Sequence, residues 1–244
     1  MGRLTDTVKI LIIINVICFI GTLLLGDTAY RLFSLYYYGS PDFKVWQPLT
    51  HMFMHGNFMH ILFNMYALFA FGSPLETRWG QKKFLFFYFS AGFGAALVHT
   101  LVNYFQYTTG YDALAAAGLG PADIMAVLET GQYNTVILES VAQDTIQNFY
   151  GAYHTPAVGA SGAIYGVLVA FGLMFPNVAL MLIFLPIPIK AKYFIPLIIV
   201  GDLFFGITGS PFGIAHWAHI GGALFGFVMA WYWKKNSFND HRLY

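Results

Sequence analysis

One serine and one histidine in this sequence stand where they could carry out nucleophilic chemistry together. Ser161 lies among small residues in AVGASGAIYG (157–166), and His219 lies in AHWAHIGG (215–222). A serine hydroxyl is a weak nucleophile until a neighbouring base takes its proton, and histidine suits that role near neutral pH. A pair of this kind can attack a carbonyl carbon and form a covalent acyl intermediate.

Two further polar residues could stabilise the negative oxygen that develops in such a reaction. His60 and Asn64 are four residues apart, so they share one face of a helix. Hydrogen-bond donors of the type that forms an oxyanion hole are the His60 ring, the Asn64 amide and the backbone N–H groups of Ser161 and Gly162. These donors can act together only if three separate segments of the chain meet.

The composition indicates what kind of structure must bring them together. Of the 244 residues, 58% are apolar and only 9% are charged, whereas a soluble domain usually has about 25% charged residues. The sequence contains apolar runs close to the length of a membrane-spanning helix and lacks the alternating segments of a membrane barrel. The net charge of +1 gives no indication of nucleic-acid binding. We therefore predict an all-α, polytopic membrane protein.

Six spans are predicted within a single domain that covers residues 1–244. They are 8–25, 57–73, 84–105, 159–175, 193–207 and 217–233. The apolar segment 178–189 is short and contains two prolines, so it is predicted to be interfacial or re-entrant.

Two long outer loops and a short tail complete the predicted topology. The loops are 27–56 and 106–158, and the cytoplasmic tail is 234–244. The second loop has apolar residues at helical spacing, which fits either amphipathic helices on the membrane surface or a small loop subdomain.

Basic residues gather at four places that an even number of spans puts on one side, which is the cytoplasmic side by the positive-inside tendency. Both termini are then cytoplasmic, and the second, fourth and sixth spans run from the outside inwards. His60, Ser161 and His219 are therefore predicted to share a shallow depth near the outer face. The basic residues are Arg3, Lys9, Arg78, Lys82, Lys83, Lys190, Lys192, Lys234, Lys235 and Arg242.

Small residues predict which two spans pack most closely. Gly162 and Gly166 are four residues apart in the fourth span, and Gly222 and Gly226 are four apart in the sixth. Such pairs let membrane helices approach one another closely. If these two ridges meet, the Ser161 hydroxyl and the His219 ring can come within hydrogen-bond reach.

Taken together, these motifs resemble those of the rhomboid family of intramembrane serine proteases, in its minimal six-helix bacterial form. The family patterns H-x-x-x-N, G-x-S-G and A-H-x-x-G occur here as HILFN (60–64), GASG (159–162) and AHIGG (218–222), in the family's order. The resemblance implies that Ser161 is the nucleophile and His219 its general base. No carboxylate is positioned by a motif as a third member, so a dyad is predicted.

The resemblance also assigns roles to residues around this dyad. His60 and Asn64 would help to form the oxyanion hole, and Tyr165 would pack on the His219 ring. Glu76, in GSPLETRWG, resembles a structural anchor near the inner end of the second span. The motif glycines Gly159 and Gly222 would support close packing of the backbone.

The activity that the resemblance implies is hydrolysis of a peptide bond in or near a substrate's transmembrane segment, close to the outer face. Transmembrane protein substrates and the lipid bilayer are the implied partners; no cofactor or metal is implied. The implied location is the bacterial cytoplasmic membrane, with substrate entering beside the fifth span. One departure is Gln47, where the family often has an arginine after Trp46, so charged anchoring of this loop to head groups is not predicted.

Other functions stay open on the residues alone. A metal site could draw on His51, His55 and His216, which have no firm role, but the H-E-x-x-H arrangement is absent. An aspartyl protease needs two aspartates at membrane depth, and the fifth span offers Asp202 alone. Asp202 is instead predicted to form a hydrogen bond within the bundle, to a partner that the sequence does not identify.

Two functions without hydrolysis also stay open. A small-solute transporter would favour a chain built from paired halves. A catalytically inactive rhomboid-like protein that binds clients would lack the nucleophile or the base.

Overall fold

Four helices in the described part of the computed structural model are long and apolar enough to cross a membrane. The structure describes residues 3–182, 185–209 and 215–236. Large apolar side chains on these helices point outward, and Leu24 is 81% exposed. Outward-facing apolar surface of this kind suits a helix whose solvent is lipid. The four are α1 (Asp6–Leu25), Phe58–Trp79, α6 (Gln81–Ala116) and α10 (Ala191–Thr208).

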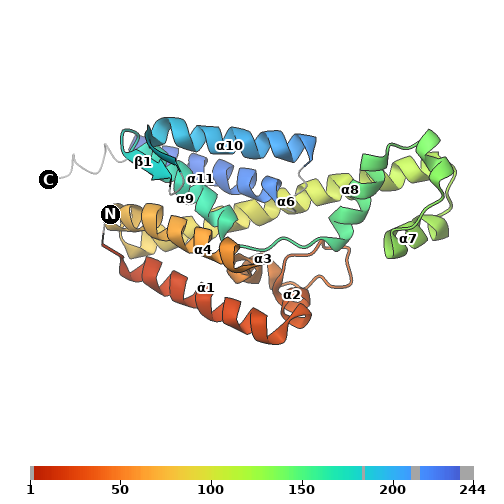
Figure 1. Ribbon diagram of the computed structural model, residues 1–244, viewed down its shortest axis with the longest axis horizontal. Coiled ribbons are helices and arrows are strands. Elements are labelled where there is room, and N and C mark those ends of the chain that lie inside the picture. The colour runs from red at the N-terminus through yellow and green to blue at the C-terminus, as the bar shows by residue number, and fades with distance from the viewer. Residues whose placement is uncertain (1–2, 183–184, 210–214, 237–244) are drawn as a thin grey trace.

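Two more helices form the centre of the bundle. They are α9 (Ser161–Met174) and α11 (His216–Asn236), which pack against one another and against α6. In Figure 1 the helices of the bundle run side by side along the long axis of the molecule. Each of the six predicted spans lies in a helical part of the chain, so the predicted helical membrane bundle is confirmed.

The second span is not one regular α-helix. It consists of α4 (Phe58–Ala67), a π-helical segment (Leu68–Gly72) and α5 (Ser73–Trp79). Asn57 caps the start of α4, because its side-chain oxygen accepts a hydrogen bond from the His60 backbone N–H at 2.9 Å. This cap sets where the helix that carries His60 and Asn64 begins.

The third span was predicted to end at residue 105, but α6 continues to Ala116. The apolar pattern fades at residue 105, yet no proline or glycine pair interrupts the helix there. The extension is stabilised by packing, since Gly110 lies against Phe149. The chain leaves the helix just before Gly118, whose φ of 92° favours glycine.

The chain beyond the bundle has a hydrophobic core of its own. The end of α6 joins α7 (Pro121–Thr130), a 3-10 turn (Thr135–Glu139) and α8 (Gln143–His154), which we call the protruding subdomain (residues 107–154). It extends away from the bundle at the end opposite the N-terminus (Figure 1). Of the two structures predicted for this loop, the contacts support the packed subdomain. Its fully buried residues are Leu114, Ile124, Leu128 and Phe149.

The first outer loop is held together by a buried glutamine. The loop contains α2 (Asp27–Phe33), α3 (Gln47–Thr50) and a 3-10 turn (His51–Phe53). The Gln47 amide donates to the carbonyl oxygens of Arg31 and Asp42, and its side-chain oxygen accepts from the Tyr36 N–H. Gln47, the residue that departs from the family pattern, therefore holds separate parts of this loop together by hydrogen bonds.

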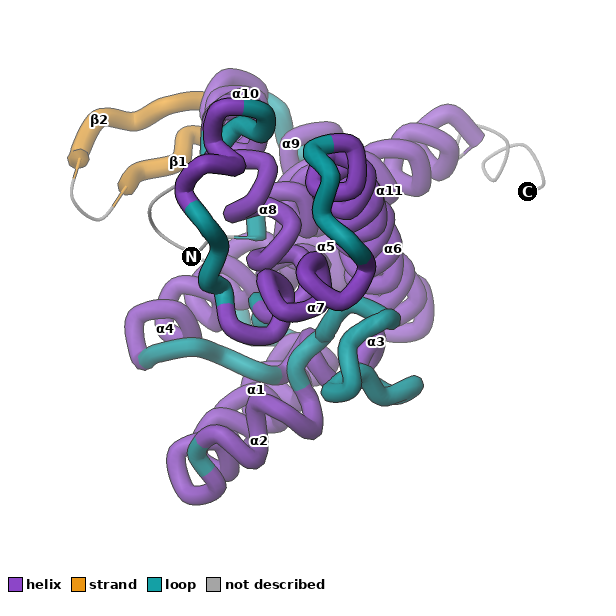
Figure 2. Tube along the Cα trace, turned by 90° about the vertical axis from the view of Figure 1, so that its right-hand side faces the viewer, coloured by secondary structure: helices purple, strands orange, loops and turns teal. Residues whose placement is uncertain are grey.

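The segment predicted to be interfacial or re-entrant contains two strands. β1 (Ala179–Leu182) pairs antiparallel with β2 (Leu185–Lys190), and Ala179 lies opposite Lys190. This hairpin stands at the edge of the bundle beside α10 (Figure 2). The predicted tail 234–244 lies outside the described residues from residue 237 onwards.

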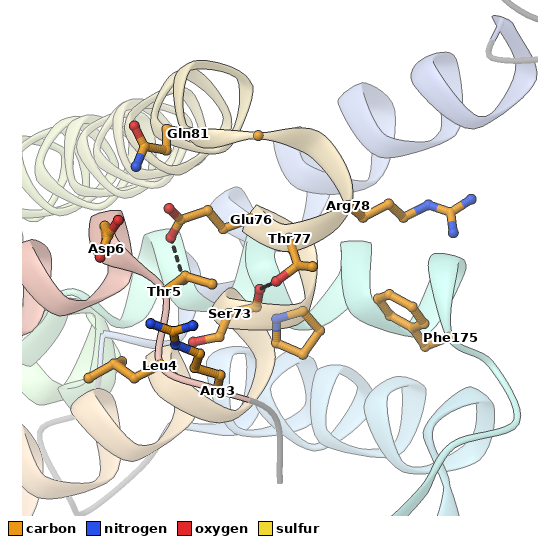
Figure 3. Close-up of a pocket in the computed structure, with 12 residues that line it drawn as sticks. Arg3, Leu4, Thr5, Asp6, Ser73, Glu76, Thr77, Arg78, Gln81 and Phe175 are labelled. Atoms are coloured by element: carbon orange, nitrogen blue, oxygen red, sulfur yellow. Dashed lines mark hydrogen bonds between the residues drawn. The ribbon is translucent and has the colours of Figure 1, made fainter.

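Glu76 links two helices at the end of the second span that is remote from His60. Its carboxylate accepts hydrogen bonds from the Thr5 hydroxyl and from the backbone N–H groups of Thr7 and Val8, the latter two at 3.0 Å. Figure 3 shows the hydrogen bond between Glu76 and Thr5, which both line a pocket of about 900 Å³. The first N–H groups of α1 would otherwise lack partners, so Glu76 attaches the start of α1 to α5.

Candidate functional site

Ser161 is the first residue of α9, at the end of the connection from the protruding subdomain. Gly159 in this connection has a φ of 123°, and its N–H donates to the His51 carbonyl oxygen at 2.9 Å. The first N–H groups of a helix have no acceptor within that helix. The amides of Ser161 and Gly162 therefore stand beside the hydroxyl as donors, at the positive end of the helix dipole.

Ser161 and His219 meet across the interface between α9 and α11. The distance from Ser161 Oγ to His219 Nε2 is 2.9 Å, which is a hydrogen-bond length. Both side chains are half-buried, so the hydroxyl can still be reached.

Glycines make this approach possible. A Cβ added to Gly222 would lie 1.8 Å from the Gly162 carbonyl oxygen, and one added to Gly226 would lie 2.4 Å from Gly166 Cα. The two backbones are thus in direct contact, with no side chains between them. The predicted meeting of the two glycine pairs is confirmed.

Tyr165 lies one turn after Ser161 and covers the histidine. Its ring stacks on the His219 ring with centroids 4.2 Å apart and planes 11° apart. The structure therefore places Tyr165 where the motif predicts it, and the contact restricts rotation of the imidazole.

Asp202 on α10 forms the hydrogen bonds within the bundle that the sequence predicts, and the structure identifies its partners as Tyr165, His216 and His219. Its Oδ1 lies 3.1 Å from His219 Nδ1, the ring nitrogen that faces away from Ser161. The same carboxylate accepts short hydrogen bonds from the Tyr165 hydroxyl and from His216 Nδ1. The available signal was that an ionisable residue inside an apolar span is a candidate for function by default, but its partners depend on how α10 is rotated.

His60 and Asn64 lie on α4, on the other side of Ser161. A Cβ on Gly159 would lie 2.9 Å from His60 Nε2 and 3.3 Å from Ser161 Oγ, so these two side chains flank the same glycine. Asn64 is buried, and its amide donates to the His60 carbonyl oxygen at 2.9 Å. The structure thus places the His60 ring and the Ser161 hydroxyl beside the same glycine, and one N–H of the Asn64 amide is bonded to the backbone of the same helix.

Two buried histidines underlie this site in the first outer loop. His51 Nδ1 lies 2.9 Å from the Gln47 carbonyl oxygen, and the His55 ring packs edge-on against His60 with centroids 5.0 Å apart. Burial lowers the pKa of His51 and the pKa of His55 to about 4 each. Both rings are therefore neutral at physiological pH and act as packing and positioning groups.

The described residues contain one group that could hold a metal ion, formed by Asp202, His216 and His219. These side chains already satisfy one another by hydrogen bonds from the two rings to the carboxylate. His219 also contacts Ser161 through its second nitrogen. These hydrogen bonds account for the positions of the three side chains without an ion. A hydroxyl beside an imidazole, with free helix N–H groups next to it, is an arrangement suited to acyl transfer.

Sequence comparison identifies the family to which this geometry corresponds. The family profile described as the Rhomboid domain matches residues 42–139 and 124–236. These ranges include every element that contributes to the site. They also include the protruding subdomain.

Individual relatives carry the same family name. An uncharacterised mitochondrial rhomboid protein of Schizosaccharomyces pombe is 27% identical over 226 residues, covering 84% of this chain and 55% of that protein. The mitochondrial presenilin-associated rhomboid-like protein of Bos taurus is 30% identical over 205 residues, covering 83% and 41%. The mitochondrial rhomboid protein 1 of Saccharomyces cerevisiae is 26% identical over 184 residues, covering 75% and 40%. The chain thus spans about half or less of the length of these relatives.

Proposed function

Because the chain belongs to the rhomboid family, we propose that it is an intramembrane serine endopeptidase that cleaves transmembrane segments of membrane proteins. The observation that carries this proposal is the 2.9 Å contact between Ser161 Oγ and His219 Nε2. A nucleophile needs an adjacent base, and this pair supplies both. The His60 ring lies next to the same glycine, Gly159, as the Ser161 hydroxyl, so it is a candidate donor on the other side of the site.

In the proposed reaction, Ser161 Oγ attacks the carbonyl carbon of the scissile peptide bond while His219 Nε2 takes the hydroxyl proton. The tetrahedral intermediate collapses when the same proton passes to the leaving amine nitrogen, and the C–N bond breaks. This step leaves an acyl-enzyme on Ser161. A water molecule then attacks the ester, with His219 again as the base, and hydrolysis restores the hydroxyl.

Negative charge on the former carbonyl oxygen needs donors that are already in place. We propose that the backbone N–H groups of Ser161 and Gly162 and the His60 ring supply them. We propose the Asn64 amide as a further donor: one of its N–H bonds goes to the His60 carbonyl oxygen at 2.9 Å, and an amide has a second N–H that can donate to the oxyanion. Removing one such donor typically costs about 10²–10³ in rate.

The proposed orientation follows the basic residues. Both termini lie on the cytoplasmic side, and the protruding subdomain lies on the outer side together with the site. The bacterial cytoplasmic membrane is proposed on the resemblance to the six-helix bacterial type, while the relatives described above are named as mitochondrial. Alkaline phosphatase fused within residues 107–154 should be active and a fusion after residue 236 inactive; the reverse pattern would invert the topology.

The central test uses purified protein in detergent with a single-span membrane-protein substrate. Ser161→Ala and His219→Ala should each abolish cleavage, and a fluorophosphonate probe should label only protein that retains Ser161. Cleavage by Ser161→Ala would overturn the proposal. If wild-type protein binds the substrate but leaves it intact and takes up no probe, the chain is a client-binding member of the family. Uptake of a small solute by vesicles that contain the protein would instead identify a transporter.

A further inference from the structure

We infer that Asp202 is a positioning residue that completes a Ser161–His219–Asp202 triad, and that Tyr165 and His216 hold its carboxylate in place. This inference rests on the proposed function, since it concerns how the same histidine acts as a base. It replaces the dyad predicted from the motifs, which contain no carboxylate.

The first argument is the position of the two nitrogens of His219. Nε2 lies 2.9 Å from Ser161 Oγ, and Nδ1 lies 3.1 Å from Asp202 Oδ1. A carboxylate can only accept at Nδ1, so the neutral ring must carry its proton there. The lone pair of Nε2 is then directed at the serine hydroxyl. The contact thus selects the one tautomer in which His219 can act as a base.

The second argument is the charge that develops during reaction. His219 becomes an imidazolium when it takes the serine proton, and a neighbouring carboxylate stabilises that state. Asp202 is only 7% exposed. In the part of the chain that the structure describes, its ionic contacts are with His216 and His219, and no lysine or arginine neutralises it. Its negative charge is therefore available to the ring.

The third argument is that the carboxylate is itself held from two sides. The Tyr165 hydroxyl donates to Oδ2, and His216 Nδ1 donates to Oδ1. Tyr165 also stacks on His219 at 4.2 Å, so one side chain fixes both the base and its partner. Donors on both oxygens hold the buried carboxylate in one orientation, because each hydrogen bond offsets part of the cost of burying its charge.

The groups around His219 come from every helix packed on the site. Tyr165 lies on α9, His216 on α11 and Asp202 on α10, while His60 on α4 and His99 on α6 are near enough to interact with it electrostatically. Of these, Asp202 is the only carboxylate. Replacing it by an amide therefore removes the negative charge that the described residues place beside the ring.

The test measures kcat and KM separately on a single-span substrate. Asp202→Asn should lower kcat by about 10²–10⁴-fold, the range for loss of general-base function through a wrong tautomer, while KM changes little. Asp202→Glu should recover part of the lost kcat, because it restores a charge that accepts from Nδ1. The matched control is Glu76→Gln, which changes a buried carboxylate to an amide at the far end of the second span and should leave kcat unchanged.

A kcat for folded Asp202→Asn within about threefold of wild type would overturn the triad. It would leave the proposed function intact as long as Ser161→Ala is inactive, so the two failures are distinguishable. If Asp202→Asn does not fold, a measurement on the wild-type protein tests the inference instead. In ¹⁵N-histidine NMR at neutral pH, His219 should carry its proton on Nδ1, and a proton on Nε2 would overturn the inference. Loss of activity in EDTA with recovery on adding zinc would assign the cluster to a metal and would also overturn it.

Discussion

The bundle and the protruding subdomain are packed by different physics, although one helix, α6, runs through both. In the bundle, α9 and α11 touch through glycines, and a Cβ on Gly222 would lie only 1.8 Å from a backbone oxygen. In the subdomain, large side chains such as Phe149 and Leu128 are fully buried against one another. Lipid tails are as apolar as leucine, so membrane helices associate by close contact and polar bonds rather than by burying apolar surface.

This difference explains why the buried polar network lies in the bundle. A hydrogen-bonded group such as Ser161–His219–Asp202 needs helices that lie close together and do not slide along one another. The glycine contact meets both needs, whereas a core of large side chains tolerates small shifts by repacking. The site is therefore most sensitive to changes that add atoms between helices. The subdomain is most sensitive to changes that remove them.

Among the changes that test this comparison of bundle and subdomain, the largest effect is expected from adding a single carbon atom at the glycine contact. Gly222→Ala must push α11 away from α9, and a displacement of about 1 Å at a catalytic pair can cost about 10²-fold in rate. Cleavage of a single-span substrate measures this loss. Gly21→Ala is the matched control, because nothing lies within 4 Å of its added Cβ. Full activity in Gly222→Ala would show that the pair does not depend on this contact.

Removing atoms from the subdomain core should have a large but local effect. Phe149 is fully buried on α8, and Phe149→Ala should destabilise the subdomain by about 3–5 kcal/mol. Limited proteolysis should then cut within residues 107–154. Fluorophosphonate labelling of Ser161 should persist, since the bundle has its own packing. Val136→Ala, at a residue 61% exposed, serves as the control; equal protease resistance in both variants would contradict the separate core.

Acidification should weaken the first outer loop that supports the site. Because burial lowers the pKa of His55 in the folded protein to about 4, below its usual 6.5, the unfolded chain binds a proton first as the pH falls. This contribution to stability is complete above pH 6.5, is lost progressively towards pH 4, and amounts to up to about 3 kcal/mol. Thermal unfolding of wild type and of His55→Phe between pH 7.5 and 5 measures it. The variant should lose less stability over this range, and identical slopes would contradict the assignment.

The smallest effect is expected at Gln47. Gln47→Ala removes the hydrogen bonds from its amide to two carbonyl oxygens and leaves the Tyr36 N–H without this acceptor. The cost should be about 1–3 kcal/mol of stability, with activity falling by less than about tenfold because no catalytic group moves. Gln47→Glu should be at least as destabilising as Gln47→Ala, because it puts a buried carboxylate oxygen against the carbonyl oxygens of Arg31 and Asp42, neither of which can donate to it. An unchanged melting temperature in Gln47→Ala would show that Gln47 does not stabilise the first outer loop.

Prediction from the sequence succeeded best for the helices of the bundle. Lipid leaves a spanning segment no alternative to a helix or closed barrel, so composition alone identifies the class. The helical period then determines that His60 and Asn64 share a face and that the Gly222 and Gly226 pair forms a ridge. The extent of α6 was predicted less well, because its last eleven residues are held by tertiary contact with α8.

Residues with several possible partners were beyond prediction. From the sequence, Gln47 indicated only that the arginine often found at this position is absent. In the structure it connects three backbone groups of a folded loop. His55 and His51 had no assigned role, and their burial follows from the path of that loop. The hairpin of β1 and β2 formed where prolines and apolar residues indicated only that a helix would be interrupted.

The order and depth of the polar residues were determined by the sequence itself, because a helix rises by a constant 1.5 Å per residue and basic residues orient the spans. That reasoning places Ser161 and His219 at one level. Only the tertiary structure decided that Asp202 joins them, because its partners lie 14, 17 and 37 residues away along the chain. Local periodicity determines which side chains share a face of one helix. The rotation of that helix against its neighbours depends on all of their contacts at once.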